Sequence, residues 1–177
     1  GEPVMTLKLA SVFSDHMVLQ HGRKNPVWGF AAPGKTVIIR LAGKKSKAVA
    51  GADGRWMTKL PALKPGGPFQ IEVACGSQSK VINDVLSGEV WICSGQSNME
   101  WTVASSNNAA HEISSANYPN IRLLSIPRRA NLKPSEEFGE TWCRCSTDTV
   151  GPFSGVGYAF GKGKGAAIGA AIGAGAG

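Results

Sequence analysis

A serine with the surroundings of a nucleophile lies in the segment Cys93-Ser94-Gly95-Gln96-Ser97. The apolar run Glu89-Val90-Trp91-Ile92-Cys93, typical of a buried strand, ends just before it, and Gly95 permits a tight turn. A serine in such a turn lies at the carboxyl end of a sheet, where open α/β sheets bind ligands. Backbone N–H groups of the turn would face a developing oxyanion. The pattern indicates acyl transfer through Ser97, although Gly-x-Ser alone also fits a serine that only caps a helix.

The elements that would position this serine form the opening of an α/β unit. The apolar strand that ends at Cys93 suits a parallel sheet covered on both faces. Residues Ala104 to Ala116 can form a helix with His111 on its exposed surface, and Asn120 to Ile126 is predicted to be the next strand. Strand, glycine-containing turn, helix and strand in this order are typical of α/β folds. Thr141 to Cys145 is a further candidate strand, and Val150 to Phe160 can begin a helix.

The first half of the chain has a different pattern, with short apolar stretches every eight to twelve residues and turn residues between them. This spacing predicts an antiparallel β-sandwich of seven or eight short strands over residues 1–86. Ala52-Asp53-Gly54-Arg55 marks a tight hairpin. The expected strands are Val27 to Phe30, Thr36 to Leu41, Lys47 to Ala50, Trp56 to Leu60, Phe69 to Ala74 and Val81 to Leu86.

The last segment, Gly161 to Gly177, contains two lysines and otherwise only glycine, alanine and isoleucine. Glycine costs about 1 kcal/mol per residue relative to alanine in a helix. We therefore expect poor order there, or a helix held only by its neighbours. The predicted organisation is a β-sandwich domain over 1–86, a partial α/β domain over 87–161 and an atypical tail over 162–177.

Composition and charge exclude several functions. The chain is 42% hydrophobic and 18% charged, as expected of a globular protein, and it has no apolar run long enough to span a membrane. The formal net charge of +7 comes from small, scattered basic groups without a nucleic-acid-binding motif, so we expect no nucleic-acid partner. Cys75 and Cys93 stand alone, and the spacing of Cys143 and Cys145 and of the histidines fits no metal site. The sequence fits either buried free thiols or one disulfide between Cys93 and Cys143 or Cys145.

The segment from Gly88 to Trp101 closely resembles the nucleophile block of the sialate O-acetylesterase family, within the SGNH (GDSL-like) hydrolases. The resemblance covers about residues 9 to 161. Other segments match the family in the same order, namely Asp15 to Gln20, Pro26 to Phe30, Ala32 to Gly34, Asp53 to Trp56, Lys64 to Phe69, Tyr118 to Leu123 and Thr149 to Tyr158. The resemblance implies a flavodoxin-like SGNH-hydrolase fold for the α/β half.

The resemblance makes Ser97 the nucleophile, with its own backbone N–H as an oxyanion donor. Gly95 keeps its family position, and Gln96 replaces the aspartate of the Gly-Asp-Ser signature. Asn98 is a candidate polar contact or a turn former, and Trp101 a candidate substrate contact or a core residue. The implied reaction is hydrolysis of O-acetyl esters on sugars such as sialic acids, without cofactor or metal.

The family's later blocks, which supply the catalytic histidine, its acidic partner and further oxyanion donors, have no counterpart in this sequence. We therefore expect a truncated, inactive chain that needs a carboxyl-terminal half. A non-catalytic carbohydrate-binding module and a frameshifted product are the alternatives. The resemblance implies a secreted, periplasmic or lysosomal-type location; the start, Gly1-Glu2-Pro3, does not resemble a signal peptide.

Two groups of residues each fit a functional and a structural interpretation. Trp28, Trp56 and Trp91 could form a sugar-stacking platform with Trp101, or they could be core residues. The basic group Lys44 to Lys47 could meet an acidic sugar, with an exposed hairpin as the simpler account.

Overall fold

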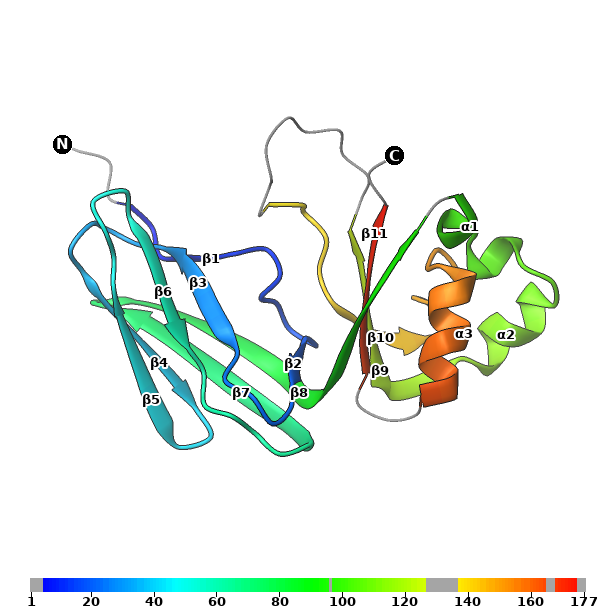
Figure 1. Ribbon diagram of the computed structural model, residues 1–177, viewed down its shortest axis with the longest axis horizontal. Coiled ribbons are helices and arrows are strands. Elements are labelled where there is room, and N and C mark those ends of the chain that lie inside the picture. The colour runs from blue at the N-terminus through cyan, green and yellow to red at the C-terminus, as the bar shows by residue number, and fades with distance from the viewer. Residues whose placement is uncertain (1–4, 96, 127–136, 165–167, 175–177) are drawn as a thin grey trace.

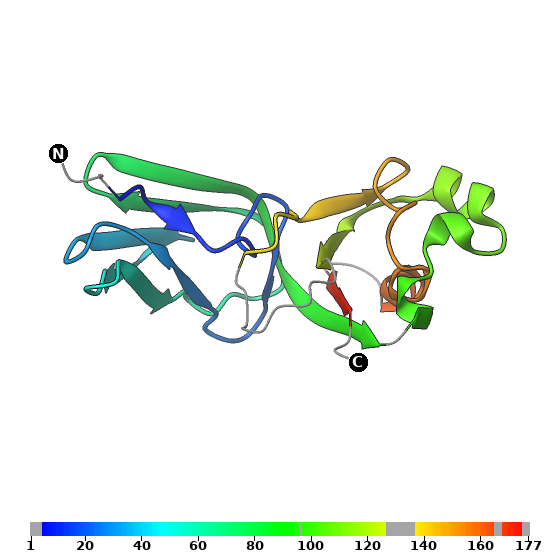
Figure 2. The same cartoon turned by 90° about the horizontal axis from the view of Figure 1, so that it is seen from above.

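The computed structural model describes residues 5–95, 97–126, 137–164 and 168–174; for residue 97 and for 168–174 it describes the backbone. The elements form two groups that share one long strand, β8 (Gln78–Gly95). In Figure 1 the first group of strands lies on the left, and the helices lie on the right. Figure 2 shows β8 crossing from one group to the other. The predicted boundary between residues 86 and 87 falls inside this strand.

The first group consists of two packed layers. A three-stranded antiparallel sheet has the order β1-β3-β6. The other layer is the first part of an eight-stranded sheet, in which β5, β4, β7 and β8 are successive neighbours and β2 joins β8. The strand bounds are β1 Lys8–Leu9, β2 Val18–Gln20, β3 Pro26–Phe30, β4 Thr36–Leu41, β5 Lys44–Val49, β6 Arg55–Lys59 and β7 Gly66–Cys75.

One apolar core holds the two layers together. Successive strand residues face opposite sides, and in β4 the residues Val37, Ile39 and Leu41 are all buried. Trp56 of β6 and Val27 of β3 belong to the same buried cluster. Each fully buried side chain of this size contributes about 1.5–3 kcal/mol relative to exposure. The alternation seen in the sequence therefore identified the strands, and it places β4 at the predicted residues.

The expectation that all strands of residues 1–86 pair antiparallel is wrong at one position. β2 runs parallel to β8, with Val18 opposite Leu86 and Gln20 opposite Gly88. β2 and β8 are far apart in the chain, so no hairpin joins them. A tight hairpin makes two strands antiparallel, whereas strands joined by a long connection can also pair in parallel.

The second group is an α/β arrangement. β8, β11 and β9 are parallel neighbours, and β10 adds antiparallel to β9. A second buried cluster, which includes Leu123, Phe153 and Tyr158, joins the helices to this sheet. The elements after β8 are α1 Ser97–Glu100, the 3-10 helix η1 Val103–Ser105, α2 Ala109–Ser115, β9 Asn117–Ile126, β10 Cys143–Ser146, α3 Gly155–Lys164 and β11 Ile168–Ala174.

The predicted helix from Ala104 to Ala116 is too long. Ser106 has an extended backbone and Asn108 a left-handed one, with φ at 62°, so η1 and α2 are separate. Serine and asparagine hydrogen-bond to nearby backbone groups in non-helical conformations, which explains the interruption in this polar stretch.

The expectation for the glycine- and alanine-rich tail is wrong for residues 168–174, and residues 165–167 and 175–177 lie outside the described part of the structure. Gly161 to Lys164 complete α3, and Ile168–Ala174 forms β11 between β8 and β9. A central strand is held by backbone hydrogen bonds to both neighbours, which do not require large side chains. The helix penalty of glycine does not apply to this conformation.

The sequence predicts that the strand before Ser97 is covered on both faces, but the described part of the structure covers only one. Trp91 packs edge-on against Phe160 of α3, with ring centroids 5.1 Å apart. On the opposite face of β8, Ile92 is 79% exposed. Among the described residues, one helix layer therefore covers only one side of β8 at Trp91 and Ile92, and the apolar pattern alone did not distinguish one covered face from two.

The four cysteines are free thiols, so the possible bridge from Cys93 is not formed. Within the described residues, no helix combines the length and apolar character needed to cross a membrane.

Candidate active site

The backbone around Ser97 lies at the carboxyl edge of three parallel strands. β8 ends at Gly95 opposite Ala174 of β11, and β9 runs in the same direction on the other side of β11. Ser97 is the first residue of α1, which follows β8 directly and lies beyond its tip in Figure 1. This is the strand-to-helix position that the sequence predicts for a nucleophile. Gln96 and the side chain of Ser97 lie outside the described part of the structure, so their roles stay predictions.

Gly95 allows α1 to turn back onto β8. A Cβ atom at this position would lie 2.7 Å from Cγ of Met99, closer than such atoms approach in proteins. Met99 is half-buried, so it packs into the space that glycine leaves. A larger residue at 95 would therefore require the Met99 side chain, or α1 that carries it, to shift.

The segment after α1 is tied to the start of α3. Gly155 N donates to the carbonyl of Trp101 at 2.8 Å, and Thr102 forms a β-bridge with Ser154. The indole Nε1 of Trp101 donates to the carbonyl of Ser105 at 2.8 Å. These contacts hold the loop around Trp101 in one conformation.

Two predicted contact residues are accessible. Asn98 is exposed, and Trp101 is 61% exposed although its Nε1 is hydrogen-bonded. Trp101 therefore presents an oriented apolar face near α1. The other tryptophans do not join it. Trp56 is buried in the first core, Trp28 packs against Phe13 with centroids 4.8 Å apart, and Trp91 is covered by Phe160.

A cation lies over the aromatic pair beside this strand. Nζ of Lys164 is 5.0 Å from the ring centroid of Trp91 and 5.5 Å from that of Phe160. Such cation–π contacts contribute about 0.5–1 kcal/mol at exposed sites. They attach the end of α3 to the last part of β8, four residues before Gly95.

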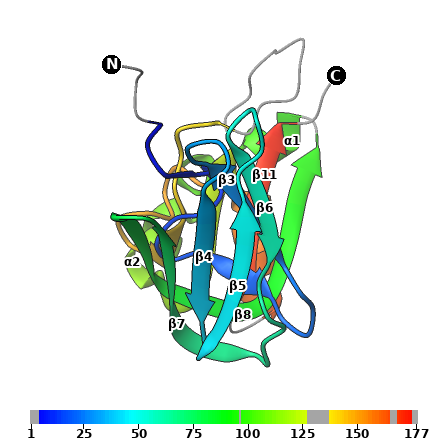
Figure 3. The same cartoon turned by 90° about the vertical axis from the view of Figure 1, so that its left-hand side faces the viewer.

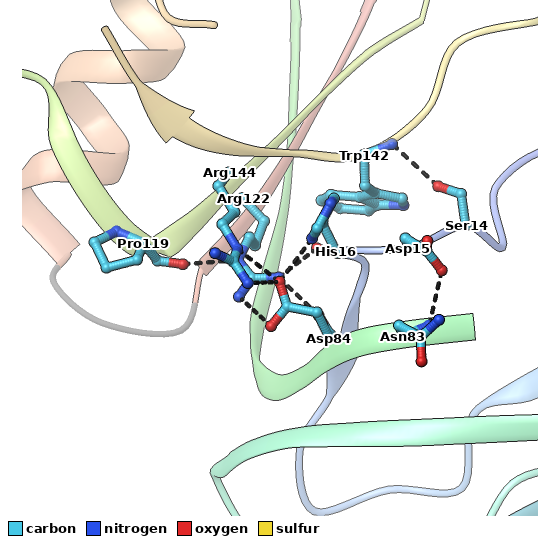
Figure 4. A network of polar contacts seen from close by, with 9 residues as sticks. All are labelled: Ser14, Asp15, His16, Asn83, Asp84, Pro119, Arg122, Trp142 and Arg144. Carbon is cyan, nitrogen blue, oxygen red and sulfur yellow. Dashed lines mark hydrogen bonds and ion pairs between the residues drawn. The ribbon is translucent and has the colours of Figure 1, made fainter. Parts of the chain in front are cut away.

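A polar cluster that the sequence reasoning missed lies where β8 leaves the first group (Figure 4). Asp84 Oδ2 is 2.6 Å from His16 Nδ1 and accepts from Arg144 Nε at 2.7 Å. Arg122 is buried and donates to Asp84 Oδ1 at 3.1 Å and to the backbone carbonyls of Asp84, His16 and Pro119.

Burial raises the pKa of Asp84, but hydrogen bonds from Arg144, His16 and Arg122 outweigh it and hold that pKa well below its usual range. The carboxylate is therefore charged at neutral pH. His16 and Asp84 both adopt a left-handed backbone, with φ at 71° and 55°, which non-glycine residues seldom adopt. The cluster thus stabilises a strained crossing of two chain segments.

The His16–Asp84 pair resembles the base half of a catalytic triad but is too far from Ser97 to act on it. At about 3.3 Å per residue, β8 carries Gly95 on the order of 30 Å from Asp84. The two arginine contacts of Asp84 instead connect β8 to β9, through Arg122, and to β10, through Arg144. One signal could have revealed the cluster, namely a single charge within each apolar strand segment: Asp84 beside Val85, and Arg122 beside Ile121.

Two further predictions concern the exposure of His111 and the absence of a metal site. His111 is exposed on α2, as expected. Among the described residues, no group of three or more histidine, cysteine or carboxylate side chains could hold a metal ion.

The chain is similar to sialate O-acetylesterases of mammals. It is 35% identical to that of Mus musculus over 156 residues, which are 81% of this chain and 29% of the relative. It is 40% identical to that of Homo sapiens over 135 residues, 67% of this chain and 25% of the relative. The chain therefore spans less than a third of the length of these relatives.

A solved structure shares the fold. A carbohydrate acetylesterase from Xanthomonas citri superposes with a TM-score of 0.91 at 30% identity, covering 96% of this chain and 40% of that chain. No protein-family model matches the chain.

Proposed function

Because the chain belongs to the sialate O-acetylesterase family, we propose that it carries the nucleophile of a serine esterase that removes O-acetyl groups from sugars. The observation that carries the proposal is the position of Ser97 at the first turn after β8, at the edge where three parallel strands end. We propose the finer architecture as well: a β-sandwich followed by the opening of an SGNH-hydrolase domain.

The proposed reaction has two steps on Ser97. Its hydroxyl attacks the acetyl carbonyl, the sugar hydroxyl leaves, and water then cleaves the acetyl-serine. The backbone N–H of Ser97 stabilises the oxyanion, together with the turn that Gly95 permits. Gln96 and Asn98 bind the acetyl group or the sugar, and the exposed ring of Trp101 packs against the sugar face.

The proposal places the general base outside these 177 residues. His16 is engaged with Asp84 in the middle of β8, the N–H of His21 donates to the carbonyl of Gly88, seven residues before Gly95, and His111 is exposed on α2. Loss of the histidine alone lowers kcat about 10⁶-fold in a serine protease. The chain by itself is therefore proposed to be nearly inactive, and its partner is the remaining catalytic part of a family enzyme.

The test combines Ser97→Ala with a matched control, Ser94→Ala, which changes an exposed serine three residues earlier on β8. The carboxyl-terminal part of a sialate O-acetylesterase is added as a separate chain, and labelling by a fluorophosphonate is followed by mass spectrometry. We expect labelling of the wild-type chain and of Ser94→Ala, and none of Ser97→Ala. Equal labelling of Ser97→Ala would refute the nucleophile. Normal hydrolysis of p-nitrophenyl acetate by the chain alone would refute the external base.

The non-catalytic carbohydrate-binding alternative predicts glycan binding with no labelling in any mixture. We also propose a secreted, periplasmic or lysosomal location, which fractionation of the cells that produce the protein would test.

A further inference from the structure

A hollow lies where the edges of the two first-group layers meet. β6 is the last strand of the three-stranded sheet, and β5 is the last strand of the eight-stranded sheet. Figure 3 shows β5 and β6 side by side, and Ser46 Oγ of β5 donates to the carbonyl of Lys59 of β6 at 2.9 Å. The hollow has a volume of about 620 Å³, within the range of roughly 300–1,000 Å³ typical of ligand sites.

Its walls are strongly basic. Lys44 and Lys45 come from β5, Lys59 from β6 and Lys24 from the loop before β3, and none of the described residues that line the hollow is acidic. All four lysines are exposed. Among the described residues, none of the four forms an ion pair with a carboxylate. Four lysines thus line one concavity, and none of them has a carboxylate partner among the described residues. We name the hollow with its nine lining residues the lysine groove: Lys24, Lys44, Lys45, Ser46, Thr58, Lys59, Leu60, Pro61 and Ala62.

The backbone around the lysine groove is held in place. Leu60 is fully buried, and its N–H donates to the carbonyl of Asn25 at 2.7 Å. The side-chain amide of Asn25 in turn donates to the carbonyls of Gln20 and Arg23. The loop that carries Lys24 is therefore fixed against the end of β6. Beyond it, Pro61 and Ala62 add small apolar surface to the basic walls.

We propose that the lysine groove binds an anionic saccharide, whose carboxylate or sulfate groups contact the lysines and whose ring packs on Pro61 and Ala62. A site for single-stranded nucleic acid would need aromatic rings for base stacking, and the nine described residues that line the groove include no aromatic one. A flat lipid surface would contact a convex face, whereas these lysines line a concavity. The proposal concerns binding alone, so it stands or falls independently of the esterase proposal.

The competing explanation is that these lysines only protect two sheet edges from pairing with other chains. Charged residues, lysine above all, serve this purpose on edge strands. Lys47 provides the matched control, because it lies on the same edge strand β5 but does not line the groove. Lys35 is likewise exposed and outside it.

The test measures binding of a galacturonic acid hexasaccharide to the full chain by calorimetry, at low and at 0.5 M salt. The groove variant Lys45→Gln/Lys59→Gln is compared with Lys35→Gln/Lys47→Gln, which removes the same charge elsewhere. We expect the groove variant to bind about five-fold or more weakly and the control variant to change less than about two-fold. Salt should weaken binding to the wild-type chain because exposed charge contacts are screened. Thermal unfolding midpoints check that both variants fold.

Three outcomes would overturn the proposal: no binding of the hexasaccharide, equal weakening by the two double variants, or binding of the neutral galactose hexasaccharide with the same affinity. Equally tight binding of a thymidine dodecamer or of phosphatidylserine vesicles, abolished in the groove variant, would replace the saccharide with a general anion and also overturn it.

Discussion

Arg122 and Asp84 form a contact between two distant strands: Nη2 of Arg122 lies 3.1 Å from Oδ1 of Asp84. Asp84 belongs to the part of β8 that pairs with β7, whereas Arg122 lies on β9 beside β11. The pair therefore joins the two groups of the fold near the point at which β8 passes between them. Because β8 also ends at the candidate nucleophile, this contact sets the direction of the strand that positions Ser97.

Replacement of Asp84 by asparagine should destabilise the fold. Asp84→Asn removes the negative charge that faces Arg122, Arg144 and His16 but keeps the size of the side chain. We expect the free energy of unfolding at pH 7 to fall by on the order of 3 kcal/mol, because the buried Arg122 loses its counter-charge. Urea unfolding followed by tryptophan fluorescence measures this change. A loss below about 0.5 kcal/mol would contradict the role of the pair.

The stability difference between the wild type and Asp84→Asn should depend on pH. The net lowering of the Asp84 pKa means that the folded state binds this proton more weakly than the unfolded chain. The stabilisation is fully present above the unfolded pKa of about 3.9 and is lost as pH falls from there toward the folded pKa. The difference in stability between wild type and Asp84→Asn should therefore narrow below about pH 4. A difference that stays constant from pH 7 to pH 3 would show that the charge is not responsible.

The two arginines around Asp84 should contribute differently to the free energy of unfolding. The side chain of Arg122 is 3% exposed and serves three carbonyls as well as the carboxylate, whereas that of Arg144 is 52% exposed. We expect Arg122→Met to cost about 3–5 kcal/mol and Arg144→Met about 1 kcal/mol or less. Both are measured by chemical unfolding, and similar losses would contradict the importance of burial.

The contact between Gly95 and Met99 can be tested with a double-mutant cycle. Gly95→Ala places a Cβ atom against Met99 Cγ, so we expect a loss of about 1–3 kcal/mol from overpacking. Met99→Ala removes the obstructing atoms, and the double variant should recover most of the loss that Gly95→Ala adds. Strictly additive single effects would show that the glycine is required for another reason.

Cys145 should be unreactive in the folded chain. Burial, followed by the neighbouring Cys143, raises the pKa of the Cys145 thiol to about 11. At pH 8 we expect iodoacetamide to modify Cys145 only after unfolding, as peptide mass spectrometry would show. Above the unfolded pKa of about 8.5, the unfolded chain releases this proton while the folded chain retains it, so stability is lost as pH rises toward 11. Cys145→Ala should reduce that loss, and rapid modification of the native chain would contradict the burial.

The strand positions were predictable because they depend on local pattern. Val37, Ile39 and Leu41 alternate with less buried residues, and turn residues bound the run, so β4 needs no information from elsewhere in the chain. The position of Ser97 at the start of α1 follows from the same local rules, an apolar strand followed by a glycine turn. The interruption at Asn108 and the single length of β8 were missed, since element boundaries depend on contacts with other elements.

By itself, the sequence determined where most strands lie, which serine follows the apolar strand and which family the chain resembles, because each of these is written in short stretches of neighbouring residues. Only the tertiary structure decided that Ile168–Ala174 lies between β8 and β9, that Ile92 is exposed on β8, and that Asp84 accepts a hydrogen bond from Arg122. It also brought Lys24, Lys45 and Lys59 around one hollow. The physical reason is that these contacts join residues far apart in the chain, where pairing partners and layer coverage are selected by the whole fold.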